Sequence, residues 1–162
     1  VERIDFFAGS NILKPLGFTL AKDHLEAKFC MPALLSMIVL NRRAGKQEFT
    51  DEFVASEAMQ EMQGRCRVIL DEEIEAKGFD KIRSRIEVHT RDGKKIVECA
   101  DEVYRGSPEN IMADADLEQK LRDATEGILD CGEQDKLIAA AWDIDMEATK
   151  DAGQIAGFLP KV

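Results

Sequence analysis

The chain has 162 residues, of which 44% are hydrophobic, and its formal net charge at pH 7 is −10. This length suits one domain with a substantial core, and the negative charge argues against nucleic acid and anionic membrane surfaces as partners. The charge is uneven, because residues 1–50 carry 7 Lys and Arg against 5 Asp and Glu, whereas residues 51–162 carry 15 against 27. We therefore expect an anionic ligand to meet the N-terminal third. The acidic remainder is typical of a solvated surface.

The first predicted element is a strand over Arg3–Ala8, because Ile4, Phe6 and Ala8 alternate with other residues and share one face. Residues 11–24 contain Pro and Gly and are expected to be irregular.

The most apolar segment, residues 29–40, predicts the central helix of the fold, over Met31–Ala44. Pro32 suits the first helical turn, where a missing N–H does no harm, and Gly45 is a typical helix stop. Because the helix is apolar nearly all round, we expect it to be buried. A membrane span needs about 20 apolar residues; this run is shorter and contains a proline, so a core helix is favoured.

Two short helices, or one broken helix, are predicted next, with Thr50 and Ser56 as N-caps and Gly64 as the stop. Alternation over residues 66–70 predicts a strand. The acidic residues 72–80 are expected to form a loop.

The Asp92-Gly93 pair predicts a β-hairpin between two alternating runs, residues 85–91 and 94–100. We expect a type I′ turn of two residues. In that register the buried face consists of two facing pairs, Val88 with Val97 and Ile86 with Cys99. The same register directs His89 outward beside Ile96 and sets Glu87 opposite Glu98 and Arg91 opposite Lys94.

After a loop over residues 104–113, the sequence predicts helices over residues 114–132 and 133–143 and a weak helix over residues 146–159. Asp114 is the expected N-cap of the first. The inward side chains are Leu117, Leu121, Ala124 and Ile128 in the first helix and Leu137, Ile138, Ala141 and Trp142 in the second. Because the strands cluster in the middle and do not alternate with helices, the fold class is α+β. We expect a two-layer sandwich, a mainly antiparallel sheet covered on one face by helices, followed by C-terminal helices.

The four cysteines, Cys30, Cys66, Cys99 and Cys131, form no CxxC motif and no Cys/His cluster. We therefore expect no metal site. Their even number permits two disulfides, but reduced, buried thiols in a cytoplasmic protein are the favoured interpretation.

No phosphate-binding glycine loop, zinc-protease motif or nucleophile elbow is present. The candidate site residues lie in the positive N-terminal third, at the entry to the central helix: His24, Lys28, Phe29 and Cys30. Cys30 lies where a helix dipole lowers a thiol pKa, or it is a small packing residue. Lys28 either steers a carboxylate or is simply solvated. His24 either takes part in the chemistry or is an ordinary surface histidine.

Several short motifs resemble, in order and spacing, those of a known enzyme family. Residues 25–32, LEAKFCMP, are similar to an EAKFS-L-P-Y signature, and residues 49–52, FTDE, to an ft-de segment. Residues 105–110, RGSPEN, resemble an rG-p-nP loop. Residues 116–121 and 137–143 resemble the closing helices. These are the motifs of the MmgE/PrpD family, and the resemblance covers nearly the whole chain.

The resemblance implies an enzyme of the type of 2-methylcitrate dehydratase, cis-aconitate decarboxylase or iminodisuccinate epimerase. These enzymes need no metal or cofactor and abstract or deliver a proton next to a carboxylate of a small polycarboxylate. Members join an all-helical N-terminal domain to a smaller α+β lid domain. Residues 1–162 resemble the lid domain alone, as a single C-terminal domain of a longer protein, and a start at Val1 without methionine fits an excised piece.

The favoured function is therefore that of a cytoplasmic lyase of the 2-methylcitrate dehydratase type, serving propionate metabolism. A decarboxylase or epimerase of the same family is an alternative. The expected partners are a small polycarboxylate, the N-terminal helical domain of the same chain and a second copy in a homodimer. A further alternative is an interaction module without substrate contacts. Phe158 and Leu159 favour it, because we expect them to be exposed apolar residues of the C-terminal helices.

The family's catalytic histidines and lysine would precede Val1, so none is assigned to this chain, and the chain alone is expected to be inactive. Three positions depart from the family pattern. This chain has Cys30 where the family usually has Ser, Ala33 where it has Tyr, and Ile111 where Pro is common.

Overall fold

A computed structural model describes residues 1–144 and 153–158 of the chain. Contacts divide the chain into two compact units, Val1–Asn110, the sheet unit, and Ile111–Val162, the helical unit. The four strands are β1 (Arg3–Ala8), β2 (Cys66–Leu70), β3 (Ser84–His89) and β4 (Lys95–Cys99). The helices of the sheet unit are α1 (Ser10–Leu13), α2 (His24–Ala27), α3 (Met31–Asn41), α4 (Asp51–Val54), α5 (Glu57–Gly64) and α6 (Glu72–Ala76). The helical unit contains α7 (Asp114–Thr125), α8 (Cys131–Trp142) and α9 (Gly153–Ala156).

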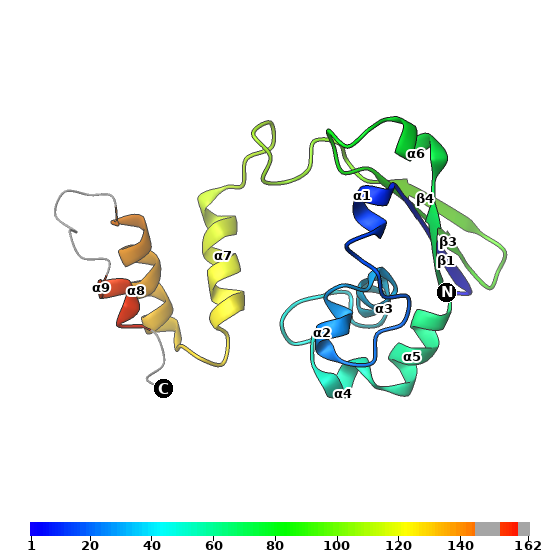
Figure 1. The fold of residues 1–162 in the computed structure, drawn as a ribbon. Helices are drawn as coiled ribbons and strands as arrows, with labels where there is room; N and C mark the ends of the chain where they lie inside the picture. The colour runs from blue at the N-terminus through cyan, green and yellow to red at the C-terminus, as the bar shows by residue number, and fades with distance from the viewer. Residues whose placement is uncertain (145–152, 159–162) are drawn as a thin grey trace. The chain divides into compact units, whose positions relative to one another are not determined.

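The strands form one sheet in the order β2-β1-β3-β4, in which β1 runs parallel to β2 and the other neighbours are antiparallel. The predicted first strand is confirmed, residue for residue. Ile4, Phe6 and Ala8 are buried on one face of β1, where they pack with Leu35 of α3 and Met62 of α5. Helices therefore cover one face of a mainly antiparallel sheet, and the α+β class is confirmed (Figure 1).

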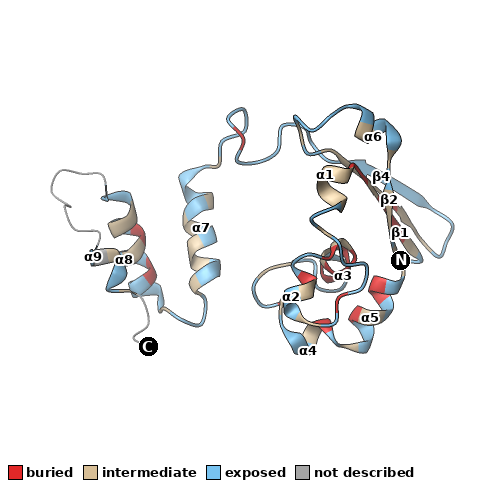
Figure 2. Cartoon of the chain, in the orientation of Figure 1, coloured by how far each residue is buried: buried red, intermediate tan, exposed pale blue. Residues whose placement is uncertain are grey.

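Helix α3 lies between two apolar clusters, which explains why its sequence is apolar nearly all round. Leu35 belongs to the cluster against the sheet. Ala33 and Met37 belong to a second cluster, made with α2, α4 and α5. Figure 2 shows buried parts of α3 in red. The predicted burial of this helix is nevertheless only partly correct, because Ile38 and Leu40 are exposed.

The predicted end of the central helix is wrong by three residues. Arg42 adopts a left-handed conformation, with φ of 60°, and its N–H donates to the Ile38 carbonyl, so α3 ends at Asn41. Gly45 is not the stop: its N–H donates to Glu48 Oε2 at 2.8 Å, in the turn that follows.

The β3–β4 hairpin forms as predicted, but its register differs by one residue. Val88 lies opposite Ile96, and Ile86 lies opposite Glu98. The loop has three residues, because Thr90 N–H donates to the Lys94 carbonyl and Gly93 N–H donates to the Thr90 carbonyl. Within this loop, Gly93 alone has a positive φ, of 81°, whereas a type I′ turn requires two consecutive residues with positive φ.

This register changes which side chains share a face of the hairpin. Ile86 and Val88 pack on the helix-covered side. Val97 and Cys99 of the predicted buried face lie on the other side and are exposed. Glu87 lies opposite Val97, and His89 lies opposite Lys95.

The face of the sheet that lacks helices is covered by its own charged side chains. Asp5 and Glu87 are both buried there. Arg3 Nε lies 2.9 Å from an Asp5 carboxylate oxygen, and Lys95 Nζ lies 2.6 Å from Glu87 Oε2. The aliphatic stems of such long cations cover the sheet while their charges pair with the carboxylates. This layer explains how the sheet is stable with helices on one side only.

Three further helices of the sheet unit differ from expectation. Helix α1 overlaps the stretch predicted to be irregular, α2 begins at the last residue of that stretch, and α6 forms within the predicted loop. Asp71 caps α6, since its side chain accepts from Glu73 N and Ile74 N. The acidic residues of α6 lie in its first turn, where negative charge favours a helix, and Gly78 follows with a φ of 82°.

The N-caps of α4 and α5 are the predicted Thr50 and Ser56.

In the helical unit, the N-cap of α7 is Ala113 and not the predicted Asp114. Helix α7 ends at Thr125, so Ile128 lies outside it and is exposed. Helix α8 begins at Cys131, because Asp130 and Glu133 form a reciprocal capping box. Trp142, expected inward, is also exposed. Part of the predicted weak helix forms as α9, over Gly153–Ala156. Residues 146–152 and Leu159 of this prediction lie outside the described residues.

All four cysteines are free thiols, but the expectation that they are buried is correct only in part. Cys30 is buried, Cys66 is half-buried, and Cys99 and Cys131 are exposed. Among the described residues, no helix combines the length and the apolar character that crossing a membrane requires.

Candidate functional site

The candidate site is the entry segment, residues 20–30, which leads into α3. Its start is fixed by a buried amide: Gln63 of α5 accepts from Ala21 N at 2.8 Å and donates to Ala21 O at 3.2 Å. Gln60 also donates to Ala21 O, at 2.8 Å. Asp23 then caps α2, accepting from Leu25 N and Glu26 N. These bonds hold a short, otherwise marginal helix in a fixed position.

His24 is tied to Asp51 at the start of α4. Asp51 Oδ1 accepts from the His24 backbone N at 2.9 Å and lies 2.6 Å from His24 Nδ1. Because an ionised carboxylate only accepts hydrogen bonds, Nδ1 carries the proton in this pair. The opposite nitrogen, Nε2, is then the one left for other groups, and the imidazole is half-exposed. This is the arrangement by which a carboxylate orients a histidine.

The two bonds from His24, first the backbone N–H and then the side chain, hold the pKa of Asp51 below its ordinary value. A carboxyl group with a depressed pKa in the folded state stabilises the fold above its unfolded pKa of about 3.9, and that stability is lost as the pH falls through the folded pKa. We expect Asp51→Asn to lower the urea midpoint of unfolding at pH 7, and the difference from the parent chain to shrink at pH 3.

The matched control is Glu52→Gln, because Glu52 lies in the same first turn of α4 and experiences the same helix dipole. Equal effects of the two substitutions at pH 7 would show that the dipole alone, and not His24, stabilises the Asp51 carboxylate.

Cys30 is buried at the N-cap of α3, and its thiol donates to Gln63 Oε1 at 3.7 Å. The predicted lowering of its pKa by the helix is wrong. Burial raises the pKa of the Cys30 thiol and outweighs its backbone hydrogen bonds. Cys30 therefore packs the base of the entry segment as a neutral thiol, which is the second of its two interpretations.

Lys28 and Phe29 are exposed at the end of α2. Lys28 has no ion-pair partner among the described residues, and with Cys30 and Phe49 it lines a small cavity of about 50 Å³. Phe29 is 47% exposed. Lys28 follows His24 by four residues in helical backbone, so the two side chains project from the same side of this turn. The structure thus places His24 and Lys28 on one turn, and Cys30 is buried beside the small cavity that Lys28 also lines.

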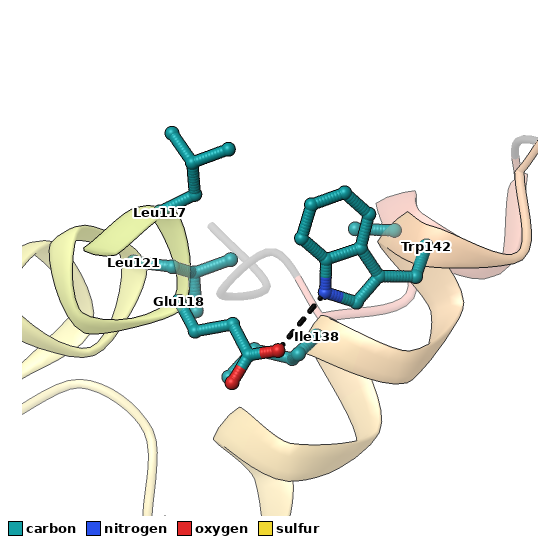
Figure 3. Close-up of a pocket in the computed structure, with 6 residues that line it drawn as sticks. Leu117, Glu118, Leu121, Ile138 and Trp142 are labelled. Atoms are coloured by element: carbon teal, nitrogen blue, oxygen red, sulfur yellow. Dashed lines mark hydrogen bonds between the residues drawn. The ribbon is translucent and has the colours of Figure 1, made fainter. Parts of the chain in front are cut away.

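A second hollow lies between α7 and α8 in the helical unit. It has a volume of about 180 Å³ and is lined by Leu117, Leu121, Ile138, Ala141, Trp142 and Glu118. Figure 3 shows the only charged group of this lining, Glu118, whose carboxylate accepts from Trp142 Nε1 at 3.1 Å. An apolar hollow with one carboxylate repels anions and suits an apolar occupant.

The sheet unit contains two further charged clusters. A cavity of about 250 Å³ lies between α6 and the β3–β4 hairpin. Its arginines are paired, Arg85 with Asp71 and Arg83 with Glu102. On the helix-free face, ligand atoms of Asp5, Glu87 and His89 lie within 4.8 Å of one another.

The ligand atoms of Asp5, Glu87 and His89 lie close enough together to hold a metal ion. However, both carboxylates already have cationic partners. Arg3 pairs with Asp5, and Lys95 pairs with Glu87. A divalent cation would have to displace these cations or lie against them, so the residues form an ion-pair network and fit a metal poorly.

Residues 1–146 match the sequence profile of the MmgE/PrpD C-terminal domain. The chain belongs to the MmgE/PrpD family. Members of this family are enzymes. No curated protein matches the chain.

The MmgE/PrpD match begins in the sheet unit and continues through α8 of the helical unit. The entry segment lies inside the match. Sequence reasoning missed two residues that organise it, Asp51 and Gln63. In the sequence Asp51 is one residue of the FTDE segment that follows a predicted N-cap, and nothing in the sequence links it to His24, 27 residues earlier.

Proposed function

We propose that this MmgE/PrpD domain closes the active site of an enzyme that acts on a small polycarboxylate, a lyase of the 2-methylcitrate dehydratase type. Decarboxylation and epimerisation are the alternative outcomes, because all three reactions involve proton transfer next to a carboxylate. The preceding helical domain of the same protein supplies the acid and the base. The present domain excludes water and contributes a cation and an oriented imidazole at its entry segment.

The observation that carries the proposal is the exposed pair of His24 and Lys28 on one turn of α2. Four other cations of the sheet unit, Arg3, Arg83, Arg85 and Lys95, are held by carboxylates. Lys28 is free of ion pairs among the described residues and lies in the positively charged N-terminal third. An unpaired ammonium binds a substrate carboxylate without first losing a partner. His24 is oriented by Asp51 through Nδ1, which leaves Nε2 for a substrate.

The test is Lys28→Ala in the full-length enzyme, assayed with 2-methylcitrate. Because Lys28 binds the substrate and does not transfer the proton, KM should rise about tenfold while kcat changes little, which corresponds to the loss of one charge-assisted contact of about 1.4 kcal/mol. Lys120→Ala removes the same charge from an exposed site on α7 and should leave both constants unchanged. An unchanged KM for Lys28→Ala would refute the role of Lys28.

The chain of 162 residues alone should convert none of these acids. The acid and base belong to the preceding domain in this proposal, so turnover of 2-methylcitrate by the purified chain, followed as formation of the double bond in the ultraviolet, would contradict this division of roles.

The proposed location is the cytoplasm. Four free thiols, two of them exposed, are the state expected in a reducing compartment.

A further inference from the structure

We propose that the hollow between α7 and α8 is a binding site for a small aromatic ammonium ion, an organic cation in which one ring carries a short amino arm. This goes beyond the proposed function and does not depend on it, because the substrate proposed above is an anion. Every residue that lines the hollow belongs to the helical unit.

Glu118 gives the hollow a negative charge that is held in place and has a free oxygen. Its Oε1 accepts from Trp142 Nε1 at 3.1 Å, which ties the carboxylate of α7 to α8 (Figure 3). A carboxylate has roughly four lone-pair sites. Among residues 1–144 and 153–158, no group donates to Oε2, and no cation pairs with Glu118. The second oxygen is therefore available to a ligand that donates hydrogen bonds.

The charge of the ligand follows from the cost of covering Glu118, which is half-buried in an otherwise apolar lining. A neutral occupant would remove the carboxylate further from water and leave Oε2 without a donor, and an anion would be repelled. An ammonium group instead donates to Oε2 in a charge-assisted hydrogen bond. The surrounding unit attracts a cation too, since residues 111–162 carry 5 Lys and Arg against 12 Asp and Glu.

The size and the lining of the hollow favour an aromatic ring. The volume is about 180 Å³, and an apolar cavity of about 150 Å³ binds benzene. The hollow therefore has room for one ring with a short arm. Leu117, Leu121 and Ile138 supply aliphatic contacts, and the indole of Trp142 supplies an aromatic surface for stacking. Trp142 is 47% exposed, so a ring that packs against it removes apolar surface from water.

The test is a calorimetric titration of the full-length protein with benzylammonium. We expect a Kd on the order of 1 mM, as suits a ligand of about eight non-hydrogen atoms. Benzyl alcohol has the ring without the charge, and butylammonium, which resembles the end of a lysine side chain, has the charge without the ring. Each should bind at least about tenfold more weakly, and benzoate should not bind. A smaller preference for benzylammonium over either compound, or no binding of benzylammonium, would overturn the proposal.

Substitution of Glu118 tests the location of the site. Glu118→Gln removes the charge but keeps an oxygen that accepts from Trp142 Nε1. The affinity for benzylammonium should therefore fall about tenfold or more, while the affinity for benzyl alcohol should not fall. Asp123→Asn is the matched control, because it removes the same charge from an exposed position of α7 outside the lining, and it should leave both affinities unchanged. Equal affinity of the parent and Glu118→Gln for benzylammonium would refute the site.

Fluorescence provides a second readout of the location. Trp142 is the only tryptophan in the 162 residues of this chain, and the proposed ring packs against its indole. Benzylammonium should therefore change the tryptophan emission of the chain, with the same Kd as in the calorimetric titration. Saturation with no change in this emission would show that the cation binds elsewhere.

Discussion

Replacing Phe6 with alanine should lower the free energy of unfolding by about 3–5 kcal/mol, as truncation of a buried aromatic side chain does in well-packed cores. Phe6 lies on the central strand β1, is 3% exposed, and packs with Leu35 and Met62. The helices that pack on Phe6 are held in place by the rest of the core, so they cannot move far enough to fill the cavity that the substitution leaves. Urea unfolding, followed by circular dichroism, measures the effect.

Phe7→Ala is the matched control, because the next residue of a strand points to the opposite face. Phe7 is only half-buried there, beneath the Arg85 guanidinium, which lies 3.9 Å from the ring centre. Its loss should cost roughly 1–2 kcal/mol, from partial burial and the cation–π contact. If the two substitutions cost the same, the core does not lie on the Phe6 side of the sheet.

Those features of the fold that depend on local chemistry were predictable from the sequence. The alternation in β1, the side-chain caps Thr50 and Ser56, and the Asp92-Gly93 hairpin all act through residues a few positions apart. Each has a sequence signature because the interacting groups are neighbours in the chain.

The details that were mispredicted depend on alternatives of similar energy. Asp92-Gly93 fits either a two-residue or a three-residue loop, and the difference of one residue moves every side chain of β4 to the other face. The end of α3 depends on Arg42 taking a left-handed conformation, which non-glycine residues rarely do. The acidic residues of α6 are ambiguous, since they suit a solvated loop and a first helical turn equally.

The sequence points to the candidate site only at the level of the segment. His24 and Lys28 project from one turn, as their spacing of four permits, but the groups that fix this turn come from elsewhere. Asp51 and Gln63 lie 27 and 42 residues from their partners His24 and Ala21. Contacts over such separations are set by the packing of α2, α4 and α5, which a single sequence does not specify.

Gln63→Leu should be strongly destabilising although it replaces a buried side chain with one of similar size. Gln63 is 1% exposed, and its amide is the acceptor for Ala21 N and the Cys30 thiol. Leucine leaves the Ala21 N–H buried without an acceptor, whereas the Ala21 carbonyl keeps its bond from Gln60. An unsatisfied buried donor costs about 1–3 kcal/mol, to which lost packing adds. The urea midpoint should fall accordingly, and Gln119→Leu on exposed α7 should change it little.

The same substitution tests whether the fold and the site are coupled. Ala21 opens the segment that carries His24 and Lys28, so its release should disorder their common turn. In the full-length enzyme, Gln63→Leu should therefore raise KM while the proton-transfer step, which the proposed function assigns to the preceding domain, keeps its pH profile. Loss of stability with an unchanged KM would mean that Asp51 and the cap at Asp23 hold the turn without Gln63, and the substrate contact would then depend on α4 and not on α5.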